Sequence, residues 1–210
     1  MQISDLITEM TIDKLIQVFK EKGYAFFDGR KSYNLNIIGV RSDSPNANTF
    51  DDHMLVVYRD ESLEWIIDKY VITTDPGKRY LKRPINIKGA AILIPGQYRS
   101  TYQIARHRGK YFALCQKGGP VKVWRDDNKD AILDHDNDVD EGWHGINIHR
   151  AHKNLTLESV NGYSAGCQVF AAPADFAYFM AICEVAESIY GNSFTYTLLD
   201  EEDLFDPDLV

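Results

Sequence analysis

Residues 145–149 read Gly-Ile-Asn-Ile-His and residues 164–167 read Ser-Ala-Gly-Cys, so that His149 precedes Cys167 by eighteen positions. The first stretch predicts a strand, and the small residues of the second predict a tight turn in which the backbone approaches other groups closely. A strand that ends in a histidine and a turn that carries a cysteine can bring the two side chains together. A thiol with an ordinary pKa of about 8.5 is weakly ionised at neutral pH, so a neighbouring imidazole would serve as its base. We expect the two to favour a thiolate–imidazolium pair, which would lower the pKa of the cysteine.

Mainly β structure is predicted around these two stretches. Further strands are expected at residues 24–27, 36–40, 54–58, 64–67, 90–94 and 98–105, and a hairpin is expected from residues 110–116 and 121–125. Helical spacing of apolar residues predicts helices at 11–22 and 175–190, with a final strand at 194–199. Thr11 is the expected cap of the first helix, and Gly23 and Gly191 are the expected helix ends.

The fold class expected from this pattern is α+β, mainly β, in one domain. We expect a helical element over residues 1–30 packed on a domain over 31–199, and a frayed acidic tail over 200–210. The apolar share of 44% in 210 residues is enough for a substantial core.

Charge and hydropathy exclude several classes of protein. The formal net charge of -8 argues against binding to nucleic-acid phosphates. We find neither an apolar run long enough for a membrane span nor the features of a signal peptide, so synthesis in the cytoplasm is expected. The oligomeric state is left open.

The three cysteines are Cys115, Cys167 and Cys183, an odd number at wide spacing that indicates neither a disulfide framework nor a zinc ribbon. Cys115 and Cys183 lie in apolar patterns and are expected in the core. Cys167 is the candidate nucleophile, and the backbone N–H groups of Gly166 and Cys167 are candidates for an oxyanion hole.

The stretch from Gly145 to His149, followed after fourteen residues by Ser164–Cys167, resembles the L,D-transpeptidase (YkuD-like) catalytic domain. The resemblance covers about 55 residues, counting the helix and strand that follow. It implies a mostly β sandwich with an N-terminal helix and a C-terminal helix and strand. It also implies that Cys167 attacks a carbonyl of a peptidoglycan stem peptide, and that His149 is a base held by an adjacent backbone carbonyl. Residues 74–77 and 95–98 loosely resemble the family's Thr-Pro-x-Gly segment.

Two positions depart from the family pattern. Ala165 stands where the family has a second histidine, and Val169 stands where it usually has arginine or asparagine. Both family residues are linked to substrate binding, so Arg150, His144 and His107 are the candidates to replace them.

The whole chain also resembles proteins encoded by tailed phages and prophages. The lack of a signal peptide fits an ordinary wall-building enzyme poorly, so we expect a phage-encoded lytic enzyme, released to the cell wall or associated with the virion.

Other patterns leave alternatives open. Asp126, Asn128 and Asp130 alternate like calcium ligands, but the glycine and glutamate of an EF-hand are absent and a solvated acidic loop is the preferred interpretation. Residues 106–108 read Arg-His-Arg, which would either meet a substrate carboxylate or lie on solvated surface. We expect a cysteine peptidase or acyl transferase that uses neither cofactor nor metal. The alternative is an inactive wall-binding or virion module that uses the acidic loop for calcium.

Overall fold

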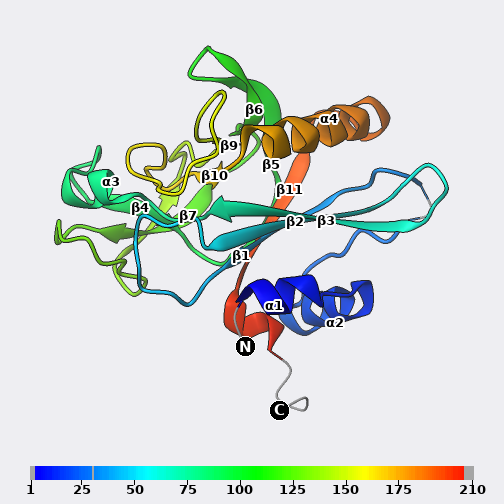
Figure 1. Ribbon diagram of the computed structural model, residues 1–210, viewed down its shortest axis with the longest axis horizontal. Coiled ribbons are helices and arrows are strands. Elements are labelled where there is room, and N and C mark those ends of the chain that lie inside the picture. Colours follow the sequence, from blue (N-terminus) through cyan, green and yellow to red (C-terminus); the bar gives the residue numbers. More distant parts are fainter. Residues whose placement is uncertain (1–2, 30, 206–210) are drawn as a thin grey trace.

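The computed structural model describes residues 3–29 and 31–205, and the fold is mainly β (Figure 1). The helices are α1 (Ile3–Thr8), α2 (Ile12–Lys22), α3 (Lys78–Lys82), α4 (Pro173–Tyr190) and the 3₁₀ turn η1 (Glu201–Leu204). The strands are β1 (Asn36–Arg41), β2 (Asp52–Arg59), β3 (Trp65–Thr73), β4 (Ala90–Leu93), β5 (Gly96–His107), β6 (Tyr111–Gln116), β7 (Val121–Asp126), β8 (Val139–Gly142), β9 (Ile148–Arg150), β10 (Gln168–Phe170) and β11 (Phe194–Asp200).

The main sheet closes on itself as a barrel in the order β1-β11-β5-β6-β9-β10-β3-β2. A sandwich of two sheets was expected from the sequence, and the closed order differs from it. Most neighbours are antiparallel, but β1 runs parallel to β11 and β9 runs parallel to β10. In the parallel pair β9–β10, His149 lies in β9, and Cys167 directly precedes β10.

A second sheet has the order β4-β7-β8 and packs beside the barrel. This sheet corrects the expected hairpin of residues 110–116 and 121–125. β6 pairs with β5 and β9 in the barrel, whereas β7 pairs with β4 and β8. The chain changes sheets at the Gly-Gly-Pro segment, where the Gly118 N–H donates to the Thr101 carbonyl at 2.8 Å.

Strands β1 and β2 are covered on both faces. Because side chains alternate along a strand, Ile37 and Met54 face the larger core with α4, while Ile38 and Leu55 face α2. Figure 1 shows α4 above this part of the sheet and α1 and α2 below it. The continuous burial of β1 follows from these two helical layers.

Local signals for helix ends are confirmed. The Thr11 side chain accepts a hydrogen bond from the Lys14 N–H, and Gly23 ends α2 in the left-handed conformation at φ 70°. The expected helix before Gly191 is also present. Residues 24–27, expected as a strand, have no regular structure.

The acidic tail is ordered as far as it is described. Leu204 of η1 is buried in the core with α2, and Lys22 pairs with Asp203. The expected fraying at 200–205 is therefore wrong, and residues 206–210 lie outside the described part. None of the helices in residues 3–29 and 31–205 is both long enough and apolar enough to cross a membrane.

Candidate active site

The parallel pair β9–β10 places the two candidate catalytic residues on neighbouring strands. Gln168 is aligned with Ile148 and Val169 with His149, which sets Cys167 beside Asn147. Because successive side chains alternate across a sheet, Asn147, His149 and Cys167 project from one face. Ile148 and Phe170 project from the other face into the core. The strand expected at 145–149 is shorter and later than predicted, because only 148–150 pair as a strand.

The turn before Cys167 is fastened by Ser164. Its hydroxyl donates to the Cys167 carbonyl at 2.8 Å and accepts from the Gly166 N–H at 3.1 Å. The Ser164 carbonyl accepts from the Gly77 N–H at 3.0 Å, so residues 74–77 lie against this turn. The Gly166 N–H is therefore not free to bind an oxyanion, and Ser164 holds the turn in shape.

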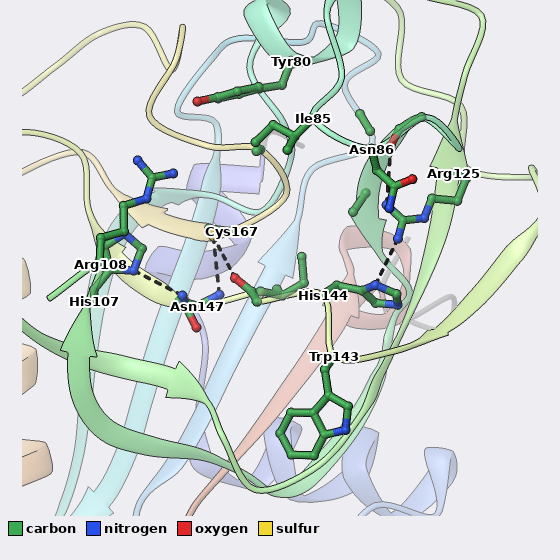
Figure 2. Close-up of a pocket in the computed structure, with 16 residues that line it drawn as sticks. Tyr80, Ile85, Asn86, His107, Arg108, Arg125, Trp143, His144, Asn147 and Cys167 are labelled. Carbon is green, nitrogen blue, oxygen red and sulfur yellow. Dashed lines mark hydrogen bonds between the residues drawn. The ribbon is translucent and has the colours of Figure 1, made fainter.

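The Cys167 thiol is half-buried and has backbone partners in the resting structure. It donates to the Gly145 carbonyl at 3.5 Å and accepts from the Asn147 N–H at 3.4 Å (Figure 2). Burial raises the pKa of Cys167 to about 11, although the Asn147 hydrogen bond and the charge of Arg108 act to lower it. A preformed thiolate–imidazolium pair was expected, and this direction contradicts it.

His149 is held as a base. Its Nδ1–H donates to the adjacent Arg150 carbonyl at 2.8 Å, which leaves Nε2 as the basic nitrogen. The Tyr111 hydroxyl also donates to that carbonyl, at 3.3 Å. Burial, with a smaller contribution from the neighbouring His107, lowers the pKa of His149 to about 3. No hydrogen bond joins His149 to Cys167 among the described residues, so the two groups rest apart as a neutral imidazole and a neutral thiol.

His107 lies against His149, with ring centroids 4.3 Å apart and 27° between the planes. Its Nδ1 accepts from the Asn147 side-chain amide at 3.2 Å, so the proton of the neutral ring is on Nε2. Burial lowers the pKa of His107 to about 4. The end of β5 thus brings a second imidazole to the site, where the family resemblance implied one from position 165.

We predict that these two buried neutral histidines make the fold sensitive to acid. Their pKa values lie below the value of about 6.5 in the unfolded chain, so below pH 6.5 the unfolded state binds more protons. Stability is therefore lost as pH falls from about 6.5 toward 4, by about 2 kcal/mol per histidine at pH 5. Urea unfolding at pH 7 and pH 5 measures the loss. His107→Gln should reduce it by about half of this sum, and an unchanged pH dependence in that variant contradicts the prediction.

A pocket of about 310 Å³ opens beside the thiol, and its wall includes Cys167, Asn147, His107 and Ala165. His149 is not part of that wall, and the histidines that line it are His107 and His144. At the position of the family's second histidine, the pocket wall has only the small side chain of Ala165.

His144 and Arg150, two of the proposed substrate ligands, have other partners. His144 lines the pocket because Gly145 bends the chain at φ 70°, but both of its ring nitrogens are engaged. Nδ1 accepts from Arg125 at 3.0 Å, and Nε2–H donates to the Asp140 carbonyl at 3.0 Å. The Arg150 guanidinium lies over the Tyr111 ring, at 4.1 Å from its centroid, and is not in the pocket wall. Arg150 contributes its backbone carbonyl to the site.

The remaining candidates lie outside the site. Cys115 and Cys183 are buried as expected. In the acidic loop the Asn128 amide donates to Asp134, and the carboxylates do not converge. Among residues 3–29 and 31–205, no group of three or more His, Cys, Asp or Glu side chains could hold a metal ion.

Sequence reasoning missed Asn147 and Tyr111. Asn147 touches Cys167 through its N–H and His107 through its amide, and Tyr111 supports the Arg150 carbonyl. The alternation of residues 145–149 contains a signal for Asn147, because it lies two positions before His149 and shares its face. Tyr111 comes from a distant strand and had no such signal.

No family model matches this chain, and comparisons with curated proteins and with solved structures also find no match. The resemblance to L,D-transpeptidases therefore stays an expectation from the sequence.

Proposed function

We propose that the chain is a cysteine peptidase or acyl transferase with an L,D-transpeptidase-like catalytic pair, in which Cys167 is the nucleophile and His149 the base. The observation that carries the proposal is the parallel pair β9–β10. It projects both side chains from one face, with the thiol in the wall of a pocket and the imidazole tautomer fixed by the Arg150 carbonyl. A buried cysteine without chemistry needs none of these features.

Because the thiol and the imidazole are both neutral at rest, the proposed mechanism is general base catalysis, in which the proton moves during the attack. As the Cys167 sulfur bonds to the substrate carbonyl carbon, the thiol proton moves to His149 Nε2. The carbon–nitrogen bond then breaks, and the leaving amine takes that proton. The product is a thioester on Cys167, which water resolves in a hydrolase and a second amine resolves in a transpeptidase. The thiol turns from the Gly145 carbonyl toward the imidazole to begin this step, and resting sites of this kind are commonly loose.

The proposed substrate is a peptidoglycan stem peptide, as the resemblance implies. A phage-encoded enzyme with this activity would meet the wall during lysis or from the virion.

The test is a mass-spectrometric digest of purified peptidoglycan with wild type and Cys167→Ala. We expect new stem-peptide products from wild type and none from the variant, because the thioester cannot form without the sulfur. Cys115→Ala, which removes a buried thiol outside the pocket, is the matched control and should retain the products. Wild type that binds peptidoglycan but releases nothing would favour the wall-binding alternative instead.

A further inference from the structure

The pocket beside Cys167 is positively charged in an acidic protein. Its charged side chains are Arg108 and Arg125, and no aspartate or glutamate is among the residues of its wall, all of which lie in the described part of the chain. The chain as a whole has a net charge of -8. Figure 2 shows the two arginines on opposite sides of Cys167.

Arg125 is already neutralised. Its Nε and one terminal nitrogen donate to the Asp140 carboxylate at 3.0 and 2.9 Å, and the same terminal nitrogen reaches His144. Its side chain is only 7% exposed. This arginine therefore fixes one wall of the pocket and has little charge left for a ligand.

Of the two arginines in the pocket wall, Arg108 has no ion-pair partner among the described residues. It lies in the turn between β5 and β6 at φ 50°, directly after His107. Its side chain is exposed, and within residues 3–29 and 31–205 no carboxylate lies at ion-pair distance from it. The positive charge of Arg108 acts to lower the pKa of the Cys167 thiol, because it favours the thiolate.

We propose that Arg108 binds a carboxylate of the acyl donor, so that the site selects peptides with a free carboxylate close to the scissile carbonyl. This inference rests on the proposed function, and it names the substrate class within it. A guanidinium binds a carboxylate through two parallel hydrogen bonds, which orients the ligand as well as attracting it. A terminal carboxylate held on Arg108 would present the adjacent peptide bond to Cys167.

Arg106 provides a matched comparison two residues earlier. It has the same charge and is also exposed, but its guanidinium lies over the Phe112 ring at 5.0 Å and is not in the pocket wall. The structure thus separates the two arginines of the Arg-His-Arg stretch: Arg108 faces the site and Arg106 lies outside it.

The experiment compares alkylation of Cys167 by iodoacetate and by iodoacetamide, two reagents of similar size that differ in a carboxylate. Each rate is followed by mass spectrometry of the Cys167 peptide and divided by the rate with N-acetylcysteine amide, a free neutral thiol. We expect wild type to favour iodoacetate by roughly fivefold on this scale, as an exposed ion pair would give. Arg108→Gln should remove that preference, Arg106→Gln should keep it, and 0.5 M salt should weaken it in wild type.

The outcomes separate this inference from the proposed function. If Cys167 reacts readily but shows no preference, or if Arg106→Gln loses the preference as fully as Arg108→Gln, the role of Arg108 is overturned while the nucleophile stands. If Cys167 reacts with neither reagent, the proposed function fails, and the inference fails with it.

Discussion

Replacing His149 with glutamine is expected to lower the turnover of peptidoglycan fragments by about two to four orders of magnitude. The thiol is protonated at rest because burial raises its pKa to about 11, so the reaction depends on a base that accepts the proton during attack. His149 Nε2 can accept that proton, because the hydrogen bond to the Arg150 carbonyl keeps the ring's own proton on Nδ1. Steady-state rates of muropeptide cleavage measure the loss.

Two further variants make this test specific. His152→Gln removes an imidazole three residues away whose Nδ1 accepts from the Asn154 and Leu155 N–H groups, and it should leave the rate unchanged. His107→Gln keeps an acceptor for Asn147 and should lower the rate less than His149→Gln does. If His107→Gln instead causes the larger loss, His107 is the base and the assignment of His149 is wrong.

Gly166→Ala is expected to destabilise the protein by about 3 kcal/mol or more. Gly166 has φ 116°, and a Cβ at this position would lie 2.2 Å from the Ala91 carbonyl oxygen of β4. The added methyl group would have to push the turn away from the second sheet, since a backbone oxygen cannot rotate aside. Urea unfolding of wild type and variant at pH 7 gives the difference in free energy.

Gly145→Ala is the control for the effect of φ alone. Gly145 has φ 70°, and a Cβ there would meet no atom within 4 Å, so we expect a loss of only about 1 kcal/mol. Equal losses in the two variants would show that contact with Ala91 does not matter.

Features encoded by neighbouring residues could be predicted from the sequence. Helix α2 was predicted with its cap and its end, because Thr11 and Gly23 act on backbone groups within a few positions. The pairing of His149 with its own following carbonyl is of the same kind, since the family resemblance implied it and the structure contains it.

Features that depend on distant segments could not be predicted. The residues of β6 and β7 have hairpin spacing, but β6 pairs with the preceding strand β5 and with β9, whereas β7 pairs with β4 and β8. Of these partners, β9 and β4 are far from β6 and β7 in the chain. The acidic residues after β11 suggested fraying, yet Leu204 finds an apolar surface formed by the N-terminal helices. The local charge predicted a solvent-exposed tail, but packing against the N-terminal helices orders residues 201–204.

The same limit applies to the site. Proximity to His149 in the sequence suggested His144 and Arg150 as substrate ligands. In the structure His144 is hydrogen-bonded to Arg125 of the second sheet, and the Arg150 guanidinium stacks on the Tyr111 ring. His107, the third candidate, stacks on the ring of the proposed base, with the centroids 4.3 Å apart. Its position depends on the register between β5 and β6, which no stretch of sequence near His149 contains.

The parallel pairing of β1 with β11 has a consequence for how the molecule matures. Ile37 is aligned with Tyr196, so the barrel joins two segments that lie far apart in the chain. A ribosome releases residues in order, and contacts between such distant segments are slow to form. The sheet that carries β9 and β10 therefore cannot close until β11 has been synthesised. A nascent or truncated chain that ends before β11 would hold His149 and Cys167 without the closed sheet that aligns them, so the proposed chemistry is coupled to the arrival of β11.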